Sequence, residues 1–465
     1  MGKNIQKFIS NPERVFIIIA GIFGLMTIFA TPIFTGADEE SHFIRAWGIS
    51  NGELFLSSKD GNEVNMPKAF RKTIGCLQSK IAQQGNAYEY KYVNYGKELS
   101  KTTNCALSIP VDEHDSERVL ASSASYNPLV YLPQVLMIYL GKIFNLPIFV
   151  IGYMVRLSVL IVYISLIYVA IRLLIHRQWV LVGVALLPHV MMQMTNPGAD
   201  HIIFGVGAIF VATIIRSRQL SQSKYESERN RLLSLLLVST IFLMIPKGVF
   251  PGICFLPFII FFGGKVKREV LPKIGIALGG VIAGLIWQKI SSATLPLTPG
   301  PSLSSLALSF PKSFIKTMFY EWANRDFLYK GIGLGLLNKV GLPGIAISLM
   351  NMLVAFYIFV SIGNKENYRQ KDKCLSYTAW VVSLAIIVGS FAAMHVMAYV
   401  LQSGDGIING VQPRYFYPAL FILAMIPMRR YIYVANEAIY RNIVIFGSVF
   451  VLTANTLAII VKYYM

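Results

Sequence analysis

Long apolar runs separated by short polar and basic segments dominate the chain. The first run, residues 15–34, holds 20 residues without a charge, which is long enough to cross a hydrocarbon core about 30 Å thick. Because no small-residue cleavage site follows it, we interpret this run as a retained transmembrane helix and not as a signal peptide. Lys3, Lys7 and Arg14 precede the run, and this flank predicts a cytoplasmic N-terminus.

Ten further apolar segments predict ten further membrane crossings. They fall at about 147–174, 178–195, 201–216, 231–247, 249–263, 273–290, 341–361, 375–398, 415–428 and 442–461. Every second loop is basic, and these loops with the N-terminus hold 21 of the 42 Lys and Arg residues. Since basic loops stay in the cytoplasm, the pattern predicts an all-α polytopic membrane protein. It has about eleven transmembrane helices, with the N-terminus inside and the C-terminus outside.

One long polar stretch, residues 35–146, interrupts the apolar pattern. It carries 12 of the 23 acidic residues and 11 basic ones, so it is about neutral. Inside it, residues 126–144 are apolar but contain Pro128 and Pro133. If this segment crossed the membrane, every later loop would change sides, so we predict a helix that lies at the outer interface. Residues 303–319 are interpreted in the same way.

The predicted organisation has four parts. They are a cytoplasmic N-terminus (1–14), a first transmembrane helix (15–34), a large extracytoplasmic loop with interfacial helices (35–146) and a multi-span domain (147–465). Cys76 and Cys105 both lie in the large loop. In an oxidising compartment they could form a disulfide, or both could remain free thiols, because sequence does not determine connectivity.

Composition and charge restrict the class of protein. Hydrophobic residues make up 55% and charged residues 14% of the chain, and the mean hydropathy is +0.56. These values exclude a soluble enzyme, a disordered chain and a fibrous protein. The net charge of +19 would suggest a nucleic-acid partner in a soluble protein. Here the basic loops account for it through topology, so we expect the lipid bilayer and no nucleic acid.

The segment GADEESHFIRAW, which directly follows the first span, carries the strongest candidate chemistry. A helix that starts near Asp38 would place Asp38, His42 and Arg45 on one face. Acidic residues at a helix start are also ordinary structural features, and both interpretations stay open. A carboxylate held at the membrane surface beside a histidine and an arginine can act as a general base. It would deprotonate a hydroxyl while the cations hold a phosphate.

Further polar residues recur at the same depth, at the outer borders of later spans. They are Asn196 and Asp200 in TNPGADH, Lys247 in IPKG, and Arg414 and Tyr415 in NGVQPRYF. Charges at an apolar border are expensive unless they are paired or functional, although Lys247 and Arg414 could instead snorkel to lipid headgroups. Carboxylates from the first loop and cations from later ones would suit a lipid-phosphate substrate.

Several common enzyme motifs are missing from the sequence. Without a Walker motif, HExxH or GxSxG, ATP-driven transport, zinc proteolysis and serine hydrolysis have no support. No loop contains the Asp-x-Asp element that nucleotide-sugar transferases often use to hold a metal. The sequence therefore identifies no cofactor, and it leaves a requirement for a divalent metal open.

The motifs resemble those of a known family. ADEESHFIRAW resembles the "DE-x-x-HF-x-RA" opening of domain-of-unknown-function family 2142 of bacterial membrane proteins. YNPLVYLPQ resembles its "YPPLYYLPQ", and NGVQPRYFYPAL is similar to its "G-x-QGRYFLP". The matches run in order from residue 36 to about 420. The chain departs from the pattern at Asp200, two residues later than usual, and at Leu337 and Asn338, which replace a Trp-Asp pair.

The family in turn resembles integral-membrane glycosyltransferases of the C-type fold (GT-C), which use polyprenyl-phosphate sugars as donors. This resemblance implies a GT-C-like fold, with Asp38 as the catalytic base and Glu39 as the second candidate. It implies that the residues beside these would bind substrate: Glu40, His42, Arg45, Tyr126, Asn127, Asn196, Asp200, Lys247, Arg414 and Tyr415. The expected function is transfer of a sugar to a cell-surface glycan, such as an O-antigen or a wall polysaccharide, at the outer face of the plasma membrane, with inversion.

Two alternative functions stay open. A transporter or flippase for a lipid-linked sugar should carry ionisable residues near mid-membrane, and only Arg156 and His395 are clear candidates. A glycan polymerase or ligase would share the outer-face chemistry, but it usually depends on a large late loop, whereas the large loop here is the first. The clustering of charge at the outer border favours the glycosyltransferase.

Overall fold

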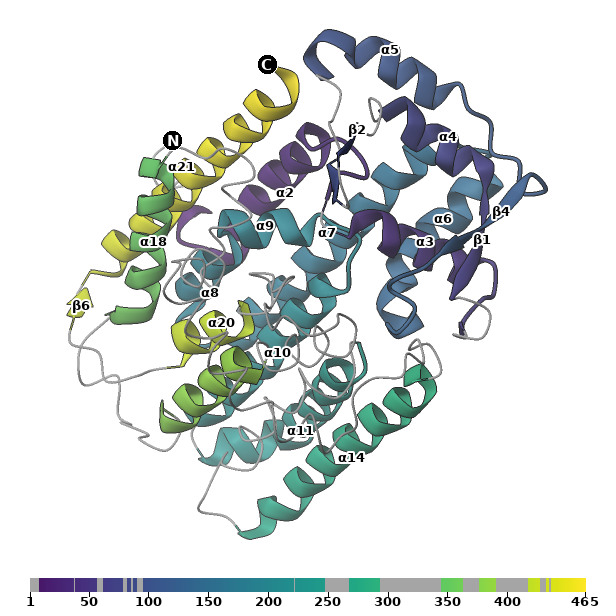
Figure 1. Cartoon of the computed structure of the whole chain (residues 1–465). Coiled ribbons are helices and arrows are strands. Elements are labelled where there is room, and N and C mark those ends of the chain that lie inside the picture. The colour runs from purple at the N-terminus through teal and green to yellow at the C-terminus, as the bar shows by residue number, and fades with distance from the viewer. Residues whose placement is uncertain are drawn as a thin grey trace.

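The computed structural model describes residues 8–36, 38–56, 62–77, 82–84, 87–89, 95–220, 222–246, 267–292, 344–362, 376–389, 417–426, 432–434 and 436–465. Within these residues the protein is mostly helical (Figure 1). Five helices are long and apolar enough to cross a membrane: Pro12–Ala30, Ile148–Leu173, Asp200–Ser217, Leu271–Ser291 and Glu437–Tyr464. The expectation of a helical multi-pass membrane protein is therefore confirmed at this level.

The helices form one bundle with a smaller pair on its side. The bundle contains α2 (Pro12–Ala30), α7 (Ile148–Leu173), α8 (Gln178–Ala185), α9 (Pro188–Met194), α10 (Asp200–Gln219), α18 (Gly344–Phe359), α20 (Tyr417–Met425) and α21 (Glu437–Tyr464). The pair is α11 (Gln222–Met244) and α14 (Lys267–Ser292), and α11 packs against α10. Figure 1 shows this pair at the edge of the molecule opposite α18 and α21.

The ends of the helices lie in two groups, and polar contacts show which helix ends belong to each group. At the first, named the basic end, the contacts are Arg172 Nη1 with Glu13 Oε1 (3.1 Å), Arg177 Nη2 with the Ala424 carbonyl (2.8 Å) and Arg216 Nη1 with the Leu173 carbonyl (3.0 Å). At the second, named the loop end, the Tyr464 hydroxyl donates to the Phe29 carbonyl (3.2 Å). Basic residues predicted to share one face thus do lie together at one end of the bundle.

The predicted single span 178–195 is a broken helix. It consists of α8 and α9, which are separated by two residues before Pro188. Proline lacks an amide hydrogen, so the helix cannot continue through it unchanged. The hydroxyl of Tyr163 on α7 donates to the freed carbonyl of Ala185 at 2.7 Å. The break is buried inside the bundle, where a freed backbone carbonyl can be satisfied by protein.

Helices α11 and α14 run in the same direction. The backbone nitrogen of Asn127 donates to the carbonyl of Pro246, just beyond the end of α11, at 3.4 Å. The indole nitrogen of Trp287, near the end of α14, donates to the carbonyl of Ser125 at 3.1 Å. Both helices therefore end at the loop end, beside the segment that contains Ser125 and Asn127.

The large polar loop folds into a loop subdomain against the loop end. It comprises α3 (Glu39–Ser50), β1 (Glu63–Pro67), α4 (Lys68–Leu77), β2 (Ala82–Gln84), β3 (Ala87–Glu89), α5 (Tyr95–Leu107), β4 (Ser116–Leu120), η2 (Pro128–Tyr131) and α6 (Leu132–Ile143). Strands β1 and β4 pair antiparallel, with Val64 opposite Val119, and β2 pairs with β3. The pairing of Cys76 with Cys105, which the sequence left open, is present as a disulfide with the Cα atoms 5.8 Å apart.

The all-α prediction therefore needs correction, because three short two-stranded sheets occur among the described residues. A third pair, β5 (Val360–Ile362) with β6 (Ile432–Val434), is parallel and follows α18. Polar connecting segments lack the helical periodicity of a buried face, and extended backbone satisfies its hydrogen bonds by pairing. The helical spans themselves are unaffected by this correction.

Helix α6 has the length that a non-crossing segment should have. Its 12 residues extend about 18 Å, which is shorter than a hydrocarbon core. One face exposes four apolar side chains: Leu132, Leu136, Tyr139 and Ile143. The opposite face buries Gln134 and Ile138 against the protein. The second predicted interfacial helix, residues 303–319, lies outside the described residues.

Candidate functional site

The corner between α2 and α3 carries the leading candidate, Asp38. Its backbone is left-handed, with φ 58° and ψ 14°, and its side chain makes no capping hydrogen bond to α3. A non-glycine residue in this region is strained by about 1 kcal/mol or more. The side chain is exposed. Helix capping, the ordinary explanation for an acidic residue here, therefore does not account for the carboxylate of Asp38.

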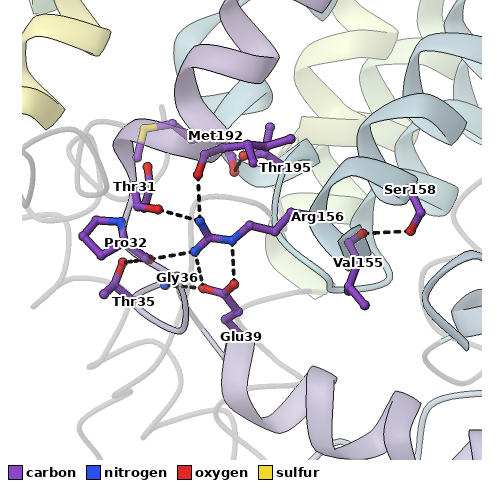
Figure 2. A network of polar contacts seen from close by, with 11 residues as sticks. Thr31, Pro32, Thr35, Gly36, Glu39, Val155, Arg156, Ser158, Met192 and Thr195 are labelled. Carbon is purple, nitrogen blue, oxygen red and sulfur yellow. Dashed lines mark hydrogen bonds and ion pairs between the residues drawn. The ribbon is translucent and has the colours of Figure 1, made fainter. Parts of the chain in front are cut away.

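The next residue, Glu39, faces the opposite way and is buried. Its carboxylate forms a two-pronged ion pair with Arg156 on α7: Nε lies 2.6 Å from Oε1, and Nη2 lies 2.7 Å from Oε2 (Figure 2). The backbone nitrogen of Gly36 also donates to Oε2, at 2.9 Å. The exposed fractions of the two side chains are 1% for Glu39 and 3% for Arg156. A carboxylate with these partners is engaged in charge-assisted hydrogen bonds and is shielded from substrate.

Arg156 also binds carbonyls in the last turn of α2 and just beyond its end. Nη1 donates to Ile28 at 3.1 Å and to Thr31 at 2.6 Å, and Nη2 donates to Pro32 at 2.8 Å. Figure 2 shows the guanidinium between these carbonyls and the Glu39 carboxylate. An arginine carries five donors in a fixed plane, so this arrangement fixes the end of α2 relative to the start of α3.

Asn196 lies at the same corner. A Cβ atom built on Gly36 would lie 2.9 Å from Glu39 Oε2 and 3.0 Å from Asn196 Nδ2. The first distance is shorter than real Cβ contacts and the second is shorter than most of them, so a larger residue at this position would displace the two side chains. The loop between α9 and α10 is thereby brought against the start of α3.

A buried histidine lies one turn along α3 from Asp38. Nδ1 of His42 and the hydroxyl of Tyr131 are 2.6 Å apart, and the ring of Tyr126 meets the imidazole edge to face with centroids 5.1 Å apart. Burial is the main cause that raises the pKa of Tyr131 well above its ordinary value, so this phenol keeps its proton. The hydrogen bond fixes the orientation of the imidazole.

Asp200 completes this cluster from the first turn of α10. Its Oδ2 accepts a hydrogen bond from Gln193 Nε2 at 2.9 Å. A Cβ atom on Gly198 would lie 3.4 Å from His42 Nε2 and 3.5 Å from Asp200 Oδ2. The imidazole and the carboxylate thus approach the same glycine, although 158 residues of chain separate them.

Asn127 connects the cluster to α11. Its side-chain oxygen accepts from the backbone nitrogen of Leu129 at 2.9 Å and so begins η2. Its backbone binds Pro246, as described above. Glu40 is half-buried on the first turn of α3. The structure thus brings together Asp38, Glu39, Glu40, His42, Tyr126, Asn127, Asn196 and Asp200 at the loop end.

Arg45 does not join them as a free cation. Its Nη1 donates to the carbonyl of Glu53 at 2.9 Å and its Nη2 to that of Leu54 at 2.7 Å. The side chain is fully buried, and burial is the main cause that lowers the pKa of Arg45. The expected phosphate contact is corrected here: this guanidinium binds the loop that follows α3 instead.

Sequence reasoning missed two residues of the cluster. The sequence marks Arg156 only as a candidate transport residue and gives Tyr131 no role. A single arginine inside an apolar span signals a buried partner, but the sequence does not say which acid supplies it. Lys247, Arg414 and Tyr415 lie outside the described residues, as do His395, Leu337 and Asn338.

Metal ligation was left open by the sequence. Among the residues that the structure describes, no group of three or more His, Cys, Asp or Glu side chains is arranged to hold a metal ion. The carboxylates of the cluster have other partners that are visible: Glu39 binds Arg156 and Asp200 binds Gln193.

Comparison with known proteins adds one match. The model of a family described as predicted membrane protein (DUF2142) matches residues 22–423. The matched region begins within α2 and extends into α20, so it includes the entire loop subdomain and the cluster at the loop end. No curated protein and no solved structure matches the chain.

Proposed function

The chain belongs to the DUF2142 family of predicted membrane proteins, and on this premise we propose that it is a membrane glycosyltransferase of the GT-C type. The donor is a sugar linked to a polyprenyl phosphate, and the acceptor is a cell-surface glycan such as an O-antigen or a wall polysaccharide. The reaction takes place at the outer face of the bacterial plasma membrane.

One observation carries the proposal: the exposed carboxylate of Asp38 lies on a strained segment between α2 and α3, at the end of a transmembrane helix. Asp38 is exposed and its backbone is left-handed. The carboxylate of its neighbour Glu39 is held in an ion pair with Arg156. Strained backbone persists where the surroundings hold it, and it concentrates at functional sites. A lipid-linked donor presents its phosphate and sugar at this depth, so the corner is a suitable place for a general base.

In the proposed reaction Asp38 accepts the proton of an acceptor hydroxyl. The hydroxyl oxygen forms a bond to the anomeric carbon of the donor sugar, and the bond from that carbon to the phosphate oxygen breaks. The polyprenyl phosphate leaves with the electron pair, and the configuration at the anomeric carbon inverts. General-base catalysis of this kind contributes about 10²- to 10⁴-fold to a rate.

The roles of the other site residues are proposed from the chemistry of their side chains and from their positions in the sequence. Lys247 and Arg414 are the proposed phosphate contacts, because Arg45 and Arg156 are engaged with other groups. Asp200 and Tyr126 suit a sugar, since a carboxylate accepts hydrogen bonds from hydroxyl groups and an aromatic ring packs on apolar ring faces. Glu40, Asn196 and Tyr415 are proposed as further polar contacts.

The proposed architecture has about eleven transmembrane helices, with a cytoplasmic N-terminus at the basic end. The contacts that Arg172, Arg177 and Arg216 make at that end support it, because cytoplasmic loops are rich in Lys and Arg. The shared direction of α11 and α14 also supports it. Two parallel neighbours need a return crossing between them, which is the place of the predicted span 249–263.

The geometry favours an enzyme over a transporter. Arg156 is one of the two candidates, with His395, for a charge that moves with a transported substrate. It is instead committed to Glu39 and to three carbonyls at the loop end. A group with this many partners cannot release them cheaply in each transport cycle. No observation favours a polymerase or ligase.

Glycan analysis tests the proposal directly. Surface glycans from cells with and without the gene should differ by the mass of one sugar. Cells that carry Asp38→Asn should resemble cells without the gene, while Asp112→Asn, an exposed acid elsewhere in the loop subdomain, should retain the modification. Normal sugar transfer by well-expressed Asp38→Asn protein would rule out the base assignment. Identical glycans with and without the gene would rule out the transferase.

A further inference from the structure

Two adjacent apolar side chains project from the irregular segment that follows α3. Their exposed fractions are 43% for Leu54 and 65% for Phe55. A single exposed leucine is ordinary on a protein surface. What distinguishes this pair is the surface that it adjoins and the way in which the backbone of the segment is held.

Phe55 lies beside Trp287, near the end of α14. The centroids of the two rings are 6.4 Å apart, and Trp287 is buried. Lys289 follows two residues later in the last turn of the helix. Tryptophan and lysine near the end of an apolar helix are typical of the border between hydrocarbon and lipid headgroups. The ring contact therefore places Phe55 close to that border at the loop end.

The surface of α14 around this contact has the character of a lipid-facing surface. The helix contains one of the five candidate spans, and only 22% of its apolar stretch is buried inside the protein. Its exposed apolar side chains include Leu278, Ile282, Leu285, Ile286 and Ile290. Ile286 and Ile290 lie at the same end of the helix as Trp287, so the apolar surface of the span continues to Phe55.

The backbone of the segment has its hydrogen-bond partners inside the protein. The nitrogen of Glu53 donates to the carbonyl of Gly48 at 2.9 Å, and that of Leu54 donates to Gly52 at 2.8 Å. Arg45 supplies donors to the two carbonyls: Nη1 to that of Glu53 at 2.9 Å and Nη2 to that of Leu54 at 2.7 Å. Both polar groups of each peptide residue are thus satisfied without solvent.

Internal satisfaction of this kind is what contact with lipid requires. An irregular segment in water can take its hydrogen bonds from solvent, whereas hydrocarbon offers none and leaves an unpaired backbone group at a high cost. The single charged side chain of residues 51–56, that of Glu53, also has a partner in the loop subdomain. Its Oε1 accepts from the backbone nitrogen of Asn65 on β1, at 3.4 Å.

We infer that Leu54 and Phe55 form a lipid anchor of the loop subdomain. Their side chains enter the leaflet at the loop end, beside α14, and contact the acyl chains there. Arg45 supplies the hydrogen bonds that the carbonyls of this segment would otherwise take from water. Arg45 belongs to α3, one turn beyond His42, so the anchor is attached to the helix that carries the cluster. The inference does not depend on the proposed sugar transfer.

The test measures where residue 55 lies in a bilayer. A nitroxide label is attached to Phe55→Cys in the full chain with Cys254→Ser and Cys374→Ser, reconstituted into vesicles of phosphatidylcholine and phosphatidylglycerol. Collisions with oxygen, which concentrates in lipid, are compared with collisions with a water-soluble nickel chelate. Leu285→Cys on the exposed surface of α14 is the lipid reference, and Asp112→Cys, exposed in the loop subdomain, is the water reference.

The anchor predicts that the label at residue 55 behaves like the lipid reference. Its ratio of oxygen to nickel accessibility should exceed that of the label at residue 112 several-fold. A ratio equal to that of the water reference would overturn the inference, because the side chain would then face solvent. Low accessibility to both reagents would also overturn it by showing that protein covers Phe55, and dipolar broadening between labels would identify that protein as a second copy of the chain.

The role of Arg45 is tested with the same label in Arg45→Lys. Lysine keeps the positive charge but lacks the planar fork that binds two carbonyls at once. The oxygen preference at residue 55 should decrease toward that of the water reference, while a label at Leu285→Cys in the same variant should keep its lipid signal and so report an intact span. An unchanged preference at residue 55 would show that the segment enters lipid without help from Arg45.

Discussion

Arg156 and Glu39 are separated by 117 residues in the sequence, yet Nε of the arginine lies 2.6 Å from Oε1 of the glutamate. Both side chains are buried. The contact joins the first half of α7 to the first turn of α3, so a charged pair attaches the loop subdomain to the transmembrane bundle. Its position beside Asp38 makes the pair the natural starting point for experiments.

Breaking this pair on one side should destabilise the protein severely. Arg156→Met leaves the carboxylate of Glu39 buried and without its cation, and removing one partner of a buried pair costs about 3–5 kcal/mol. Thermal melting in detergent should show a large decrease. Arg172→Met, which removes an exposed partner, should lower stability by about 1 kcal/mol or less. Similar decreases for the two variants would contradict the burial of the Arg156 pair.

The close approach at Gly36 gives a second prediction. A methyl group there would lie 2.9 Å from Glu39 Oε2 and 3.0 Å from Asn196 Nδ2. Gly36→Ala should therefore displace the corner and destabilise the fold by about 1–3 kcal/mol, and sugar transfer should decrease with it. Gly21→Ala is the matched control, because a Cβ atom on Gly21 meets nothing within 4 Å. An unchanged melting temperature for Gly36→Ala would show that a Cβ atom at residue 36 fits beside Glu39 and Asn196 without cost.

The bond between Tyr131 and His42 gives a prediction with a pH dependence. Burial raises the pKa of Tyr131, so the unfolded chain loses this proton at a lower pH than the folded protein does. The contribution of Tyr131 to stability is therefore complete below about pH 10 and decreases as the pH rises above that value. The stability advantage of wild type over Tyr131→Phe should thus be smaller at about pH 11 than at about pH 8.

Melting curves of the two proteins at both pH values check this difference. Below pH 10 the advantage should be about 1–3 kcal/mol, because Tyr131→Phe leaves the buried Nδ1 of His42 without its partner. The control is Tyr139→Phe, whose ring is exposed on α6 and whose replacement should have little effect. An advantage that stays constant between the two pH values would contradict the buried, protonated phenol.

The disulfide of the loop subdomain gives the last prediction. Cys76 and Cys105 are 29 residues apart, and closing a loop of that length stabilises a fold by about 3.6 kcal/mol in the chain-entropy description. Cys105→Ser should therefore make the segment between β1 and β4 more susceptible to limited proteolysis, while the transmembrane helices remain resistant. Wild-type protein treated with a reductant should show the same cleavage pattern. Equal resistance with and without the disulfide would contradict its structural role.

The outline of the fold could be predicted from local patterns. Runs such as 15–34 and 147–174 correspond to α2 and α7 within a few residues, because a span is determined by the number of consecutive apolar residues. The same reasoning separated the polar loop and recognised that 126–144 differs from a span. It could not predict the break before Pro188, because a proline inside an apolar run is compatible with either a kinked or an interrupted helix.

The candidate site, too, has one part that the sequence predicts and another that it does not. The motif around Asp38 was evident from its position after the first span and from the family resemblance, and both are properties of the sequence alone. The orientations of its members were not: Glu39 turns inward to Arg156, Arg45 turns away to bind Glu53 and Leu54, and only Asp38 remains exposed.

The sequence alone therefore determined that the chain is a mostly helical multi-pass membrane protein and that an acidic segment directly follows the first apolar run, because these follow from hydrophobicity and charge over short stretches of chain. Only the tertiary structure decided which carboxylate is exposed and which is paired. That choice depends on a guanidinium delivered by α7 from more than 100 residues away, and the energy of a buried charge is determined by the partner that surrounds it and not by its neighbours in sequence.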